Sequence, residues 1–91
     1  MTSDTRVLKS YVWHGDKCYF VSTIERDSSA CTEPPARRYN ETIVWDYDWT
    51  KDARGELLGM AGDGRGMIDV HLEIIRRIFR EGFTPETCDF A

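Results

Sequence analysis

Two carboxylates two residues apart, Asp46 and Asp48, are the first candidates for chemistry in this chain. Side chains at i and i+2 of a strand point to the same face, about 7 Å apart. Glycosidases use carboxylate pairs at comparable distances. Such a pair also needs a cleft that brings a substrate to both groups, and 91 residues leave little material to build one. We therefore interpret the pair as strand polarity that forms an acidic patch with Asp52 and Glu56.

A glycine-rich connection is the second candidate. Gly62, Gly64 and Gly66 precede a predicted helix, and free N–H groups at a helix start can hold an anion. Their alternating spacing is neither a GxGxxG fingerprint nor a P-loop, because no lysine follows in the required place. The expected role is a connector, with weak anion binding at these three glycines as the alternative.

Histidine and cysteine suggest no further chemistry. His71 falls inside the apolar arc of the predicted helix, where an imidazole is usually hydrogen-bonded and neutral. His14 and Cys18 can approach each other across a turn, but two ligands do not make a zinc site. The three cysteines form no CxxC and are expected to be reduced thiols: Cys18, Cys31 and Cys88. We predict no catalytic group, no metal and no cofactor.

Charge argues against nucleic acid as a partner. The chain carries 16 acidic and 12 basic residues, a net charge of −4, whereas nucleic-acid binding depends on basic groups that neutralise phosphates. The main basic cluster, Arg76, Arg77 and Arg80, is interpreted as the solvated side of a helix. No apolar run approaches the ~18 residues of a membrane span. The first ten residues contain no apolar signal region, so we expect a cytoplasmic protein.

Three aromatic-rich stretches alternate like strands and one stretch has helical periodicity. The predicted elements are strands at 6–13, 18–25 and 39–49, a weaker strand at 56–60 and a helix at 67–81. This order, β-β-β-(β)-α, predicts the α+β class: an antiparallel three- to four-stranded meander sheet with one C-terminal amphipathic helix packed on one face. Residues 1–91 form one small domain, with 1–5 and 84–91 loosely ordered and a long loop at 27–38.

The first hairpin can be predicted in register. A two-residue loop at Gly15-Asp16 pairs Trp13 with Cys18 and Tyr11 with Phe20. The strand alternation then divides the sheet into two faces. One face carries most of the aromatic area and is expected to lie beneath the helix: Tyr11, Trp13, Phe20, Ile24, Trp45, Tyr47 and Trp49. The other face mixes apolar and polar residues and is expected to be an interface: Leu8, Val12, Tyr19, Val21 and Val44.

A single helix covers one face of a sheet, so the second face needs water or a partner. We therefore expect a small, non-catalytic protein–protein interaction module that docks a copy of itself, most simply as a twofold dimer, or another protein. One alternative is an inhibitor or adaptor whose acidic patch binds a nucleic-acid-handling protein. The other alternative is a small-ligand or phosphate site at the glycine-rich connection.

Overall fold

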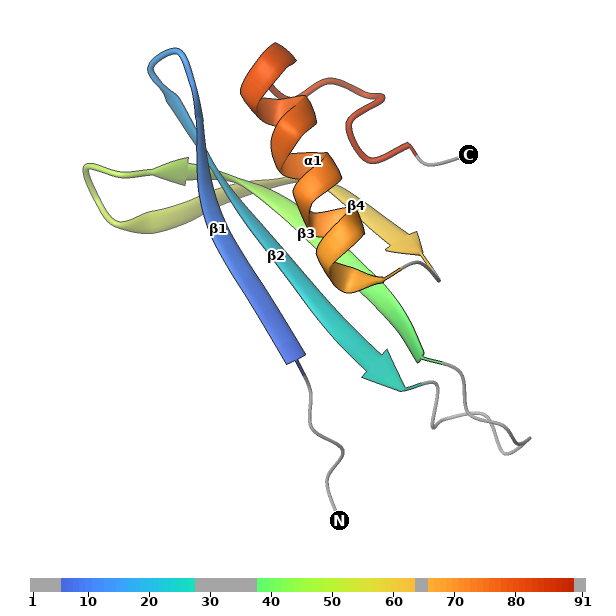
Figure 1. The fold of residues 1–91 in the computed structure, drawn as a ribbon. Helices are drawn as coiled ribbons and strands as arrows, with labels where there is room; N and C mark the ends of the chain where they lie inside the picture. The colour runs from blue at the N-terminus through green and yellow to red at the C-terminus, as the bar shows by residue number, and fades with distance from the viewer. Residues whose placement is uncertain (1–5, 28–37, 64–65, 90–91) are drawn as a thin grey trace.

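The computed structural model describes residues 6–27, 38–63 and 66–89. Four antiparallel strands form one sheet in the order in which they follow along the chain, and one helix packs against it (Figure 1). The predicted α+β meander with a C-terminal helix is confirmed. The elements are β1 (Arg6–His14), β2 (Lys17–Asp27), β3 (Arg38–Asp48), β4 (Ala53–Asp63) and α1 (Met67–Glu81).

The β1–β2 hairpin has the predicted register, with Trp13 opposite Cys18 and Tyr11 opposite Phe20. Gly15 lies in the turn with φ 63°, a backbone conformation that side chains disfavour and glycine tolerates. The local turn chemistry therefore sets the pairing of the first two strands.

The β3–β4 hairpin differs from the prediction in extent. β4 covers Ala53–Asp63, eleven residues, where the sequence favours only 56–60. Its register against β3 shifts on both sides of Trp45, and such irregularities bend a strand and increase its twist. Gly59 and Gly62 lower the intrinsic strand preference of this segment, but pairing along β3 outweighs it. Gly62 therefore lies in a strand, not in the connection before the helix.

α1 covers the face opposite to the one we expected. Its buried side chains, Val70, Ile74 and Ile78, pack on Val21 and Val44, which have no exposed area. All five residues assigned to an open interface lie on this helix-covered face, so that assignment is wrong: Leu8, Val12, Tyr19, Val21 and Val44. The aromatic face is the one that lies away from the helix.

A buried histidine accounts for much of this choice. His71 is 4% exposed, and its Nδ1 lies 2.7 Å from Thr23 Oγ1 while its Nε2 lies 2.8 Å from Ser10 Oγ. Thr23 Oγ1 is also 2.7 Å from Thr42 Oγ1. A buried imidazole without partners is costly, and the hydroxyl groups of Ser10 and Thr23 supply both partners on this face. Apolar area alone therefore did not decide which face the helix covers.

The C-terminal segment after α1 is hydrogen-bonded to the helix. α1 ends at Glu81, the boundary predicted from the sequence, and Gly82 follows it with φ 71°. Arg77 then donates from one guanidinium nitrogen to the carbonyl oxygens of Glu86, Thr87 and Asp89, at 2.7–3.1 Å. This arrangement places residues 84–89 beside the helix; that residues 84–91 are loosely ordered stays a prediction. The predictions for 1–5 and for the interior of loop 27–38 lie outside the described residues.

Candidate docking surface

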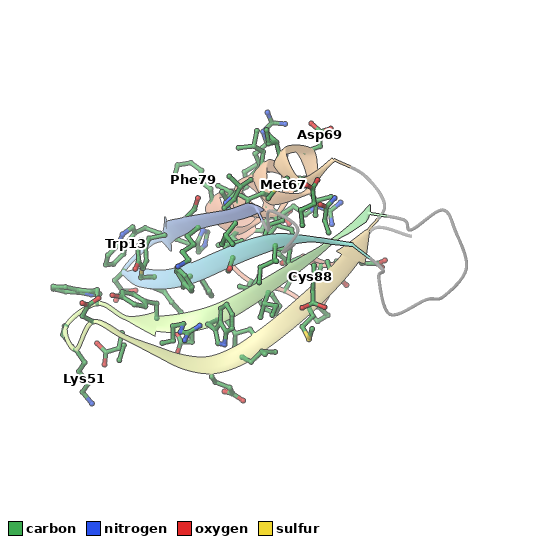
Figure 2. The ribbon with its side chains drawn as sticks, turned by 90° about the horizontal axis from the view of Figure 1, so that it is seen from below. Trp13, Lys51, Met67, Asp69, Phe79 and Cys88 are labelled. Atoms are coloured by element: carbon green, nitrogen blue, oxygen red, sulfur yellow. The ribbon has the colours of Figure 1, made fainter. Side chains whose placement is uncertain are left out.

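The sheet surface opposite α1, which we call the open face, is built from side chains of all four strands. Its apolar members are Val7, Tyr11, Trp13, Phe20, Trp45, Tyr47, Leu57 and Met60, with Trp49 at its end. Figure 2 shows the helix on one side of the sheet only, with Trp13 near the end of β1. Tyr11 and Trp49 remain 56% and 60% exposed. Large exposed aromatic side chains are more frequent at protein interfaces than on the rest of the protein surface.

The rings of the open face form a row across three strands. The ring centroids of Tyr11 and Tyr47 are 4.8 Å apart, those of Tyr11 and Phe20 are 5.2 Å apart, and those of Phe20 and Trp45 are 5.6 Å apart. The rings are tilted relative to one another, which aromatic pairs favour over flat stacking. Phe20 is only 7% exposed because neighbouring side chains cover it, although no helix lies on this face. The row is therefore a fixed surface rather than a set of independent side chains.

A cation lies against this row. The guanidinium carbon of Arg54 is 4.8 Å from the centroid of the Trp45 ring and 5.9 Å from that of Phe20. Arg54 makes no hydrogen bond or ion pair with the other described residues. It borders a shallow basin of about 390 Å³ lined by Lys9, Tyr11, Phe20, Ser22, Tyr47, Asp52 and Arg54. The basin combines ring faces with two cationic groups, on a chain of net negative charge.

One hydrogen bond orients the floor of the basin. The hydroxyl of Tyr47 donates to Asp52, and this hydrogen bond raises the pKa of Tyr47 above its usual range. Asp52 has a φ of 49° in the β3–β4 turn, a conformation that Asp tolerates better than most residues. A second hollow of about 340 Å³ continues along the face between Trp13, Trp49 and their neighbours. Both hollows are open to solvent, so together they form a surface rather than a closed cavity.

The four residues of the predicted acidic patch lie on different sides of the sheet. Asp46 points away from the open face and lies 3.6 Å from the Lys17 ammonium. Asp48 accepts hydrogen bonds from the hydroxyl and the backbone N–H of Thr50, which lower the pKa of Asp48. Asp52 contacts Tyr47 on the open face, and Glu56 is exposed in β4. They do not form one continuous patch.

The predicted anion site has little geometric support. Of its three glycines, Gly62 lies in β4, Gly64 lies outside the described residues, and Gly66 precedes the helix. A Cβ at Gly66 would lie 3.5 Å from a carboxylate oxygen of Asp69. A carboxylate in the first turn already complements the positive end of the helix dipole. It would also repel a second anion.

The remaining candidates for chemistry are used in packing. His71 is enclosed between α1 and the sheet, and burial lowers its pKa. The two described cysteines, Cys18 and Cys88, are free thiols whose pKa values are raised by burial. Within 6–27, 38–63 and 66–89, no three His, Cys, Asp or Glu side chains are close enough to hold a metal ion.

Strand alternation correctly predicts that the aromatic residues of the first three strands share one face, but the prediction that the helix covers this face is wrong. One available signal pointed the other way. Ser10, Thr23 and Thr42 alternate on the same face as Val21, and His71 lies in the apolar arc of the helix. A buried imidazole needs hydroxyl or carbonyl partners, so the face with these hydroxyls was the better candidate for the helix.

The fold defines a two-layer α+β domain with an aromatic sheet surface opposite its helix. Comparison with protein-family models, with curated protein sequences and with solved structures found no significant match. The helix in the described part of the chain, α1, is neither long nor apolar enough to cross a membrane.

Proposed function

We propose that the protein is a non-catalytic interaction module that docks a partner protein on the open face. The observation that carries this proposal is the aromatic row with exposed Tyr11, Trp13 and Trp49 opposite the helix-covered face. Scattered exposed apolar residues are normal on folded proteins. A contiguous exposed aromatic surface is unusual on a chain this small, and such surfaces commonly take part in binding.

The dimensions of the open face suit a protein partner. Strands of nine to eleven residues are about 30–36 Å long, and four strands are about 19 Å wide, which outlines roughly 600 Å². A stable interface buries about 800 Å² on each partner. The outline ignores the area added by protruding side chains and by the adjoining turns. With these included, the area of the open face approaches that of a stable interface.

The charges of the open face indicate the chemistry of the partner. Lys9 and Arg54 line the basin, and among the described residues that line it the single carboxylate, that of Asp52, accepts a hydrogen bond from Tyr47. Within the described part of the chain, the N–H groups of Arg54 have no hydrogen-bond partner while its planar face rests on Trp45, and stacked arginines and aromatic rings are typical binding hot spots. We expect a partner with an apolar patch bordered by carboxylates.

The two alternatives from the sequence have less support. The four carboxylates of the adaptor hypothesis are dispersed over both sides of the sheet. The glycines of the phosphate hypothesis do not converge, and Asp69 lies where an anion would bind. The open face is therefore the surface to test first.

A peptide-display experiment tests the proposal without a known partner. Random peptides selected on the 91-residue chain should combine apolar residues with Asp or Glu, and should shift the NMR resonances of Tyr11, Phe20 and Trp45. Arg54→Glu should weaken their binding at least about tenfold, because it replaces a hot-spot cation by a repelling charge. The matched control is Arg80→Glu, a charge reversal on exposed helix surface, which should leave binding intact. Peptides without acidic residues, or equal losses for both variants, would contradict the proposal.

A further inference from the structure

We infer that two copies of this chain associate edge to edge, through β1 and the flank of α1 that overhangs it. This surface adjoins the open face, with which it shares side chains of β1 such as Lys9 and Tyr11, but the inference does not depend on the proposed function. It rests on three observations: a second apolar stripe on the helix, an uninterrupted sheet edge beside it, and the charges that border the stripe.

The helix is apolar beyond the part that the sheet covers. Its core-facing residues are Met67, Val70, His71, Ile74 and Ile78. A second stripe follows the 4-3-4 spacing of a helix seam: Ile68, Leu72, Ile75 and Phe79. Phe79 is 69% exposed and Ile68 is 59% exposed, while Ile75 is half-buried against the core. The sequence shows one wide apolar arc, and the structure leaves about half of it in solvent.

The stripe lies on the β1 side of the helix. At 100° per residue, it flanks the core side next to His71 and opposite Arg77. His71 bonds to Ser10 of β1, whereas Arg77 bonds to the C-terminal segment on the far flank. At the end of the helix, His14 of β1 donates from Nδ1 to the carbonyl oxygen of Phe79 at 3.1 Å. The exposed stripe therefore overhangs the outer edge of the sheet.

β1 is an edge strand whose outer side is suited to pairing with a strand of another molecule. It pairs with β2 through nine consecutive residue pairs without a bulge, and no other described strand pairs with it. Such an edge presents unpaired N–H and C=O groups to another strand. The opposite edge, β4, has an irregular register, and the C-terminal segment approaches it at Gly59. Of the two edges, only β1 combines regular geometry with an adjoining apolar surface.

A second copy fits this surface by symmetry. A twofold axis perpendicular to the sheet pairs β1 with β1 in antiparallel orientation and places the two helices side by side on the same face. The same axis turns the helices antiparallel, so stripe meets stripe. If the strand pairing is centred on Ser10, the middle residue of β1, Lys9 of each copy lies opposite Tyr11 of the other. Two lysines then never face each other.

The charges beside the stripe are complementary under this axis. Asp69 and Arg76 both lie on its outer border, two helical turns apart. The position midway between Asp69 and Arg76 is within one residue of the position midway along the stripe, so one twofold axis can pass close to both. Antiparallel pairing therefore brings Asp69 of one copy beside Arg76 of the other, and it sets the positive start of each helix dipole beside the negative end of its neighbour.

The area is sufficient for a dimer. A nine-residue strand is about 30 Å long, and a helix on a sheet is about 15–20 Å deep, so the flank outlines roughly 500 Å². Two copies bury roughly 1,000 Å² before side-chain relief is counted, which is the size at which interfaces separate from incidental contacts.

Light scattering coupled to size exclusion tests the inference on the full chain. The wild type should have about twice the chain mass of 10.6 kDa at high micromolar concentration. Leu72→Arg and Phe79→Glu change exposed residues, so the fold should persist while self-association weakens at least about tenfold. The matched control is Trp49→Ser, which removes an equally exposed aromatic side chain from the open face and should leave the dimer intact. A monomeric wild type, or a dimer lost in Trp49→Ser and kept in Phe79→Glu, would overturn the inference.

A charge exchange tests the predicted pairing itself. Asp69→Lys and Arg76→Glu should each weaken the dimer, because each places like charges opposite one another twice per dimer. The double variant should restore most of the affinity. No restoration would overturn the antiparallel arrangement. Peptide binding to the open face should persist in the four helix variants Asp69→Lys, Leu72→Arg, Arg76→Glu and Phe79→Glu, so a failure of either proposal can be told from a failure of the other.

Discussion

The guanidinium group of Arg54 in β4 lies over the ring of Trp45 in β3, 4.8 Å from its centroid. Cation–π contacts at exposed sites contribute about 0.5–1 kcal/mol to stability. Arg54→Ala should lower the free energy of unfolding by about this amount, measured by urea unfolding followed through tryptophan fluorescence. Arg80→Ala, which removes an exposed arginine of α1, should cost less than about half as much.

The buried His71 should make stability depend on pH. Burial lowers its pKa in the folded state below the ordinary 6.5, so below about pH 6.5 the unfolded chain binds more protons than the folded one. The stabilising contribution is therefore fully present above about pH 6.5 and is lost as the pH falls below that value. Urea midpoints at pH 7.5 and pH 5.5 should show this decrease.

The His71→Gln variant provides the control for this pH dependence. Glutamine cannot titrate but can hydrogen-bond to Ser10 and Thr23, so the difference between the two midpoints should shrink. His14→Gln changes the other histidine, which is exposed. In this variant the difference between the two urea midpoints should stay as large as in the wild type. If the difference between the midpoints at pH 7.5 and pH 5.5 is unchanged in His71→Gln, another group is responsible for the pH dependence.

Gly59 allows the C-terminal segment to approach the sheet. A Cβ at this position would lie 2.7 Å from Cζ of Phe83 and 3.3 Å from the sulfur of Cys88, so the segment must shift to admit it. Gly59→Ala should lower the free energy of unfolding by about 1–2 kcal/mol. Gly62→Ala is the matched control in the same strand, because its nearest atom would be 4.0 Å away. It should be neutral or slightly stabilising.

Arg77 should hold the C-terminal segment in place. Arg77→Ala removes the hydrogen bonds to the carbonyl oxygens of Glu86, Thr87 and Asp89, which frees the segment to move. Cys88, half-buried and with a pKa raised by burial, should then react faster with iodoacetamide, as measured by peptide mass spectrometry. Arg76→Ala, one residue away and directed to solvent, should leave the rate unchanged.

The face that α1 covers can be tested with one substitution on each side of the sheet. Val44 is fully buried beneath the helix, whereas Leu57 of the open face is 47% exposed. Val44→Asp buries an unpaired carboxylate and should cost about 3 kcal/mol or more. Leu57→Asp should leave a cooperatively folded protein. If Leu57→Asp unfolds the chain and Val44→Asp does not, the two faces are assigned the wrong way round.

Most of the local structure could be predicted from the residues alone. Alternation predicted three strands, the Gly15-Asp16 loop predicted the register of the first hairpin, and helical periodicity predicted the helix at 67–81. These features depend on interactions between residues close in sequence, such as turn conformation and helix capping. The length of β4 was underestimated because its glycines weaken the local strand signal. Its pairing with β3 stabilises the full strand, and a local pattern does not show this pairing.

The composition of the two sheet faces was determined by the sequence, but the choice between them was made only by the tertiary structure. A period of two divides the side chains into two sets without saying which set meets the helix. Small β-branched residues such as Val21 and Val44 let the helix approach closely, and hydroxyl groups on the same face receive His71. Both conditions depend on groups far apart in the chain, so no local pattern could reveal them. The aromatic set, with the larger apolar area, was left on the outside, where its rings pack on one another and on Arg54.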